Sequence, residues 1–328
     1  MLNTILGAVL PMVVTFLLGF VAARRRDFGA KDALTLNRMV LVYAVPLALF
    51  AGTVSTSRAQ LSQDIPLVTA LCIAIIGLYG AVFLLSNIAF RLPMSVSALG
   101  ALTASAPAVP FVGQAVLGDL FGGESAIPIA IGSLVVNLTV VPITILFLML
   151  NTAERGFPES SLAAQHGHSA SPPASQLSIL TTKLAETIKE PMVWAPVLAF
   201  AIVLSGLHVP RLIIHSLFML GQASGGVALF ACGIVLASAA LKLDRQVLFL
   251  VFLKNIAQPA LVLSGMRWLG YDNSIGSEAA LTTAIPTMPI VIMLALQYHV
   301  KQAEAASAVF LSMIGSGITI GIFIDLTS

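Results

Sequence analysis

Two ten-residue stretches decide the fold of this chain: ALTASAPAVP at residues 101–110 and ALTTAIPTMP at residues 280–289. They share five of ten positions, including both prolines, at an offset of 179 residues. Each stretch lies inside an apolar segment, where a proline removes a backbone N–H and clashes with the preceding helical turn. Two prolines three residues apart therefore predict that the helix opens at Pro107–Pro110 and again at Pro286–Pro289.

The composition around these stretches is typical of a membrane protein. Of 328 residues, 58% are hydrophobic and 9% are charged, whereas soluble domains average about 25% charged residues. A membrane-spanning helix needs roughly 20 apolar residues. Ten segments meet this length loosely and are predicted to span: residues 4–22, 35–54, 65–89, 96–117, 126–150, 191–208, 212–240, 246–269, 279–299 and 304–325.

The basic residues give these spans an orientation. With the N-terminus outside, 12 of the 16 Lys and Arg residues fall on the inner side, three fall outside, and Lys254 lies within a span. Inner loops of membrane proteins are enriched in Lys and Arg. We therefore expect a multi-pass protein of the cell membrane with both termini outside and the central loop in the cytoplasm.

The two halves of the chain repeat one another. Pro11–Val13 recurs as Pro191–Val193, and Ala48–Ala51 recurs as Ala228–Ala231, both at an offset of 180 residues. Because five spans is an odd number, a second copy would enter the membrane from the opposite face, the inverted plan of many secondary transporters. The predicted organisation is a first five-helix repeat at residues 1–150, a cytoplasmic linker at residues 151–190 and a second five-helix repeat at residues 191–328.

Polar side chains gather near both predicted breaks. A hydroxyl in a membrane helix commonly bonds to a carbonyl of its own helix, but a set placed around two matching breaks favours a substrate-lining role. In the fifth span, Asn137 would either bond across helices or line the cavity. The predicted substrate-binding residues are Thr103, Ser105, Pro107, Pro110, Asn137, Gln222, Thr282, Thr283, Pro286, Thr287 and Pro289.

Lys254 is the only ionisable side chain well inside a predicted span. A lysine at the centre of a membrane helix costs roughly 2.5–3.5 kcal/mol on insertion scales, so such a residue usually faces the protein interior. Because it lies one or two turns into the span, its side chain could also extend to the inner interface. We expect Lys254, Asn255 and Gln258 to serve charge compensation or ion coupling, and a structural tether to backbone carbonyls is the alternative for Lys254.

Several classes of protein are disfavoured. The chain has no Gly-rich phosphate loop, no His-Glu-x-x-His and no Gly-x-Ser-x-Gly motif, so we expect neither an enzyme nor a bound cofactor. His166 and His168 stand without further ligands in the linker, which predicts no metal site. No basic cluster with interleaved aromatic residues indicates nucleic-acid binding. The coupling ion, H⁺ or Na⁺, stays open.

The chain resembles the auxin efflux carrier family. The resemblance rests on LPMVVTFLLGFVAARRRDFGAKDALTLNRMVLVYAVPLALFA near the N-terminus, on LKLDRQVLFLVFLKNIAQPAL and on ALTTAIPTMPIVIMLALQYH. It covers the chain apart from the linker and is strongest toward bacterial malonate and malate carriers. It implies an all-helical membrane protein of ten helices in a 5+5 inverted repeat, with crossed broken helices four and nine. Plant members place an Asn-Thr pair where Ala104-Ser105 stands here, which favours a small carboxylate over auxin.

We therefore predict a secondary transporter of a small mono- or dicarboxylate, such as malonate or malate, in a bacterial inner membrane. Its expected partners are the organic anion and membrane lipids. A sodium-coupled symporter of the bile-acid type and a non-transporting membrane receptor are the alternatives. Gly317-x-x-x-Gly321 would suit a close helix contact within the chain or in a homodimer.

Overall fold

The computed structural model describes residues 2–55, 65–154, 191–207, 209–238, 241–271 and 274–327. Within these ranges the secondary structure is helical, and no strand occurs. The linker predicted at residues 151–190, with His166 and His168, lies outside the described residues except for its first four positions. Those four continue the last helix of the first half to Glu154, past the predicted boundary at residue 150.

The first half of the chain begins with one long helix and ends with another. The elements in order are α1 (Leu2–Arg24), α2 (Ala30–Met39), η1 (Val40–Ala44), α3 (Val45–Val54), α5 (Ile65–Cys72), η2 (Ile73–Gly77), α6 (Leu78–Leu84), η3 (Leu85–Ala89), α7 (Met94–Ser105), α8 (Val109–Phe121), η4 (Gly122–Ser125), α9 (Ala126–Val135), η5 (Val136–Val140) and α10 (Val141–Glu154).

The second half follows a similar order of long and interrupted helices. Its elements are α12 (Pro191–Ser205), α13 (Arg211–Ser238), α14 (Arg245–Phe252), η6 (Leu253–Ala257), α15 (Gln258–Trp268), α16 (Ser274–Ala284), α17 (Ile290–Gln297) and α18 (Gln302–Thr327).

Six helices among the described residues are long and apolar enough to cross a membrane. They are Ala30–Val54, Ile65–Ala89, Ala126–Leu150, Arg211–Ser238, Arg245–Trp268 and Gln302–Thr327. Each coincides with a predicted span, while Val9–Arg24, Met94–Ser105 and Val193–Ser205 are shorter apolar helices. The count of ten spans and the inverted relation of the two halves stay predictions.

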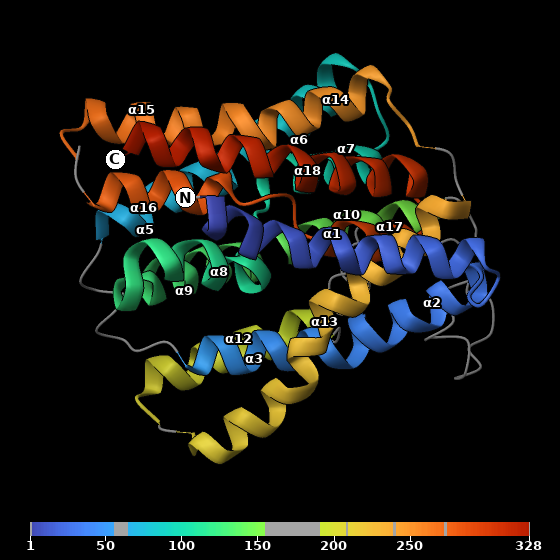
Figure 1. Cartoon of the computed structure of the whole chain (residues 1–328), viewed down its shortest axis with the longest axis horizontal. Helices are drawn as coiled ribbons and strands as arrows, with labels where there is room; N and C mark the ends of the chain where they lie inside the picture. Colours follow the sequence, from blue (N-terminus) through green and yellow to red (C-terminus); the bar gives the residue numbers. More distant parts are fainter. Residues whose placement is uncertain are drawn as a thin grey trace.

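The helices form two bundles that lie against each other. The first bundle contains α1, α2, α3, α12 and α13, and the remaining helices form the second bundle. In Figure 1, α2, α3, α12 and α13 lie toward the bottom of the view and α1 crosses its middle. In the first bundle α1 and α13 touch backbone to backbone, since a Cβ added at Gly233 would lie 2.6 Å from the Phe20 nitrogen. Helices α8 and α18 of the second bundle pack against α1.

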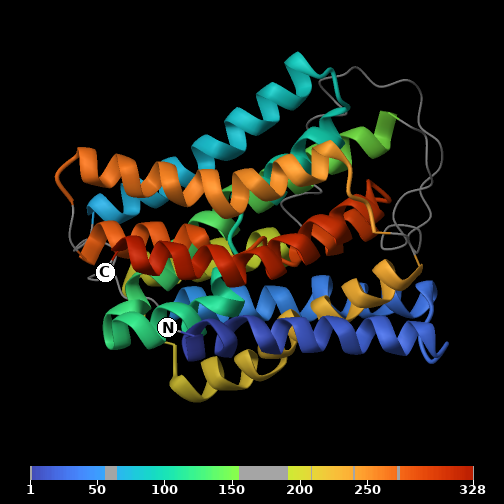
Figure 2. The same cartoon turned by 45° about the horizontal axis from the view of Figure 1, so that its top comes forward.

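The two ends of the chain lie at the same end of the molecule (Figures 1 and 2). The turn after α15 lies at this end too, because the Arg267 Nη2 donates a hydrogen bond to the Leu326 carbonyl at 2.6 Å. We call this end the terminal face.

Among the described residues, three of the five wide, π-helical turns end two residues before a proline. They are η1, η5 and η6, which precede Pro46, Pro142 and Pro259. A proline inside a helix leaves the carbonyl four residues earlier without its donor and crowds it, and a widened turn relieves that crowding. Two of these turns hold the polar residues Asn137, Lys254 and Asn255, so the prolines help to set where those side chains point.

Candidate functional site

The first predicted break is present: Pro107 ends one helix, and Pro110 lies in the first turn of the next. Helix α7 ends at Ser105 because Ala106, which precedes Pro107, is extended with φ −92° and ψ 106°. A residue before proline is disfavoured in the helical region. Helix α8 then starts at Val109 with Pro110 in its first turn, where a missing N–H has no partner to lose.

The second break mirrors the first and crosses it. Helix α16 ends at Ala284, and α17 starts at Ile290 with Pro289 as its N-cap. Pro107 and Thr287 pair in an antiparallel bridge. The Ala108 N–H donates to the Pro286 carbonyl at 2.8 Å, and the Met288 N–H donates to the Ala106 carbonyl at 3.0 Å. Each opened backbone therefore satisfies the other, as buried polar backbone at membrane depth requires.

Side chains from α18 and η6 complete the crossing. The Thr287 hydroxyl donates to the Thr103 carbonyl at 2.9 Å, and the Thr287 N–H donates to the Ser312 hydroxyl at 2.9 Å. Ser312 donates in turn to Asn255 Oδ1 at 2.6 Å, and Asn255 Nδ2 returns a bond to the Ser312 carbonyl at 2.8 Å. The sequence does not predict Ser312 as a site residue, since a lone serine in an apolar helix carries no directional signal.

Lys254 lies in the interior and does not reach the interface. It is 0% exposed, and its ammonium donates to the Thr283 carbonyl at 2.6 Å and to Gln258 Oε1 at 2.9 Å. Gln258 Nε2 donates to the Ser105 carbonyl at 3.0 Å. Lys254 and Gln258 thus bond the C-terminal ends of α16 and α7, where a helix carries partial negative charge. Within the described part of the chain no carboxylate lies in ion-pair distance of Lys254.

Four of the predicted hydroxyls around the crossing are buried and bond to their own helices. Thr103 donates to the Leu99 carbonyl and Ser105 to that of Ala101, at 2.7 and 2.8 Å. In α16, Thr282 donates to the Glu278 carbonyl at 2.6 Å, and Thr283 bonds the Ala279 and Ala280 carbonyls. Their hydroxyl protons are therefore used inside the fold, and a substrate-binding role for these four residues stays a prediction. Of Pro110 the structure describes the backbone alone.

A cavity of about 620 Å³ lies between the two bundles. One wall comes from α1, α3 and α13 of the first bundle, and the other comes from α9 and η5 of the second. Two predicted site residues, Asn137 and Gln222, line it. The full lining is Pro11, Met12, Thr15, Ala48, Leu49, Gly52, Thr53, Ser55, Ala126, Ile129, Ala130, Ser133, Leu134, Asn137, Phe218, Gly221, Gln222, Gly225, Gly226 and Leu229.

The cavity adjoins the crossed breaks through α9. A Cβ added at Gly132 would lie 3.1 Å from the Thr282 methyl group, so α9 packs directly on α16 near its C-terminal end. Asn137, one turn further along, is 2% exposed, and its Oδ1 has no hydrogen-bond partner among the described residues. Buried polar atoms are nearly always bonded. Of the two such atoms among the described residues, Asn37 Oδ1 and Asn137 Oδ1, the second belongs to a side chain of the cavity wall, which favours this wall as a place for a ligand.

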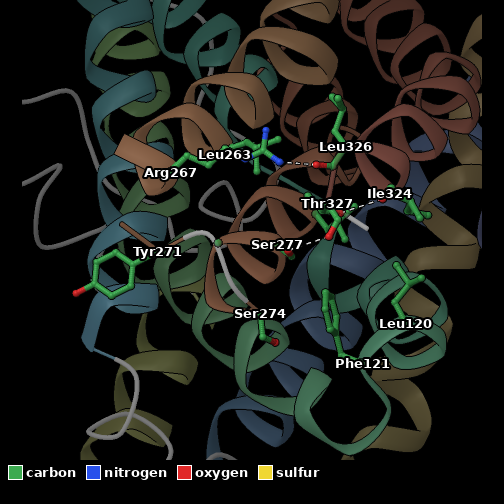
Figure 3. A pocket seen from close by; sticks show the side chains of 12 residues that line it. Leu120, Phe121, Leu263, Arg267, Tyr271, Ser274, Ser277, Ile324, Leu326 and Thr327 are labelled. Atoms are coloured by element: carbon green, nitrogen blue, oxygen red, sulfur yellow. Dashed lines mark hydrogen bonds between the residues drawn. The ribbon is translucent and has the colours of Figure 1, made fainter. Parts of the chain in front are cut away.

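A second cavity, of about 580 Å³, lies at the terminal face (Figure 3). Arg267 points to Leu326 there, and Ser277 donates to the Thr327 carbonyl at 3.4 Å. Its walls are α8, α15, α16 and α18, which all belong to the second bundle. The described residues that line this cavity belong to the second bundle, and no predicted site residue is among them.

Comparison with known proteins assigns the chain to a family. A family model described as "Membrane transport protein" matches residues 4–324. The chain belongs to this family. Its relatives include the "Uncharacterized transporter YfdV" of Escherichia coli (strain K12), which is 29% identical over 327 residues, 99% of this chain and 98% of that protein.

Two more distant relatives carry names that mention a substrate. The "Putative malonate transporter" of Rhizobium meliloti (strain 1021) is 23% identical and aligns over 96% of this chain and 93% of its own length. "Auxin efflux carrier component 8" of Arabidopsis thaliana is 21% identical, with 94% of each chain covered. The family resemblance predicted from the sequence is thereby confirmed, and the chain is a multi-pass membrane transporter.

Proposed function

We propose that this protein is a secondary carrier of a small organic anion, a mono- or dicarboxylate such as malonate or malate, that works by alternating access. The observation that supports it most is the crossing of two matching helix breaks beside a cavity shared by two bundles. In transporters of this plan, substrate sites lie where discontinuous helices meet between repeats.

The cavity between the bundles suits such a carrier better than the cavity at the terminal face. Movement of one bundle against the other changes the shape and access of a site only when both bundles line it. The 620 Å³ cavity meets this condition, whereas the described walls of the 580 Å³ cavity come from the second bundle. Helices α8 and α17 both begin at the crossing, and their positive ends would favour an anion nearby.

Transport assays in proteoliposomes test this function. We expect uptake of labelled malonate or malate by the wild-type chain, measured with and without H⁺ and Na⁺ gradients to identify the coupling ion. A strict requirement for Na⁺ would favour the sodium-coupled alternative. Ligand binding without any flux would favour the receptor alternative, and neither binding nor flux of any carboxylate would reject the substrate class.

A double variant connects the assay to the crossed breaks. Pro107→Ala with Pro286→Ala restores two backbone N–H groups and lets both helices close, so we expect turnover to fall at least about tenfold, the effect of about 1.4 kcal/mol on a barrier. Pro196→Ala is the matched control, because Pro196 lies inside α12 of the first bundle. Equal turnover in the double variant and the control would contradict the role of the breaks.

A further inference from the structure

We propose that the cavity between the bundles binds an organic acid with a single negative charge and a hydrogen-bond donor in addition to its carboxylate. For a dicarboxylate this is the half-protonated form, and for a monocarboxylate it is a hydroxy acid. The inference rests on the proposed function, in that it assigns the substrate to this cavity, and it narrows the substrate class.

The polar lining of the cavity offers acceptors in excess. A hydroxyl has one proton to donate and two lone pairs to accept with. Three lining hydroxyls donate that proton to their own helix at 2.6–2.7 Å: Thr15 to Pro11, Ser55 to Ala51 and Ser133 to Ile129. Their oxygens keep acceptor capacity, and the unbonded Asn137 Oδ1 adds a buried acceptor. A ligand with a proton of its own to donate would satisfy these acceptors.

The lining also lacks charge. Among the described residues that line the cavity, none is Lys, Arg, His, Asp or Glu. Lys254 is buried, but it is bonded to Thr283 and Gln258 and does not line this cavity. A fully ionised dicarboxylate would bring two charges and acceptor oxygens alone, and burying unpaired charge in such a wall is strongly unfavourable.

A singly charged acid with a donor matches the same wall. The amide N–H groups of Gln222 and Asn137 and the Thr53 hydroxyl are the side-chain donors among the described lining residues that a carboxylate would use. The donor of the ligand would then satisfy Asn137 Oδ1 or the oxygen of Ser133, one turn away on α9. Each part of the ligand therefore has a complementary group on the wall.

Matched probe acids test the proposal on the purified full-length protein. 3-Hydroxypropionate and 3-methoxypropionate each carry one charge and differ in the donor. We expect 3-hydroxypropionate to bind about tenfold more tightly, measured by thermal shift in detergent and by inhibition of uptake, as for one hydrogen bond to a buried acceptor. Malonate binding should strengthen as the pH falls through its second ionisation, while 3-hydroxypropionate binding at the same pH values serves as the control.

Substitutions then locate the effect. Asn137→Leu should reduce the preference for 3-hydroxypropionate to near unity, and Ser133→Ala should reduce it in part. Ser216→Ala removes a similarly back-bonded hydroxyl of α13 that does not line the cavity, and it should keep the full preference. If Asn137→Leu fails to fold, the comparison of the two acids on the wild-type protein and on Ser133→Ala still tests the preference for a donor.

Two results would overturn the proposal while leaving the carrier function intact. One is equal binding of the hydroxy and methoxy acids by the wild-type protein. The other is malonate binding that strengthens as the pH rises, which would identify the dianion as the ligand. Absence of binding by all three acids, together with absence of uptake, would instead count against the proposed function itself.

Discussion

At the scale of single residues, Lys254 combines burial with neutral partners. Its ammonium donates hydrogen bonds to the Thr283 carbonyl and the Gln258 amide oxygen, and its side chain is 0% exposed. A charge at this depth is tolerated because it lies at the C-terminal end of α16, where backbone carbonyls concentrate negative potential. Gln258 carries the connection on to α7 through the Ser105 carbonyl. Lys254 therefore ties together the ends of both broken helices.

Removing that amine should destabilise the protein. Lys254→Met keeps the length of the side chain but leaves two buried acceptors unpaired, which we expect to lower the free energy of unfolding by about 1–3 kcal/mol. Thermal unfolding in one detergent measures it. Lys301→Met is the control, because the Lys301 side chain is 46% exposed and its ion pair with Glu304 is worth about 0–1 kcal/mol. A Lys254→Met protein as stable as the control would contradict this account.

Residue-level prediction from the sequence succeeds where the cause is local and stops where it depends on packing. The prolines predict both breaks, because Pro107 and Pro286 act on their own helices. The unusual depth of Lys254 predicts that it matters, but its partner Thr283 is 29 residues away and Ser105 lies on another helix. The acceptors Thr15 and Ser133 escape prediction, since a hydroxyl in an apolar helix gives no sign of which neighbour it faces.

At the scale of elements, small residues set how closely the helices of the first bundle approach. Helix α13 meets α3 at Gly221, where an added Cβ would lie 2.7 Å from the Ala48 Cα and 2.8 Å from its nitrogen. Both are backbone atoms, so a change of side-chain rotamer cannot relieve the contact.

The wide turns are predictable from the sequence only where a proline causes them. The turns η1, η5 and η6 precede a proline, while η2 and η3 do not and have no such signal in the sequence.

A methyl group at Gly221 should therefore force α13 and α3 apart. We expect Gly221→Ala to cost about 1–3 kcal/mol, the usual effect of overpacking a close contact. Gly226→Ala on the same helix meets nothing within 4 Å and should stabilise by up to about 1 kcal/mol, since alanine is the better helix former. Thermal unfolding of both variants side by side checks the sign of each. The account is wrong if Gly221→Ala is the more stable of the two.

At the scale of the whole molecule, two bundles share one cavity, and this arrangement is what a sequence repeat alone does not reveal. The offset of 179–180 residues predicts two related halves, but each half contributes helices to both bundles: α1 to α3 and α5 to α10 come from the first, and α12, α13 and α14 to α18 from the second. Neither bundle therefore corresponds to one half of the chain. A carrier built this way must expose the shared cavity to each side of the membrane in turn.

Cysteine accessibility tests that requirement directly. In a background with Cys72→Ala and Cys232→Ala, neither of which lines the cavity, Ser133→Cys places one thiol in the cavity wall. A carrier should let a membrane-impermeant thiol reagent reach it from either side, in right-side-out and in inverted vesicles, and bound substrate should slow both reactions. Leu269→Cys, in the turn after α15 at the terminal face, should react from one side alone, and from the outer side if both termini are outside. Reaction of Ser133→Cys from a single side would mean that the two bundles hold a fixed pocket, as a receptor would, because no movement would then carry the cavity across the membrane.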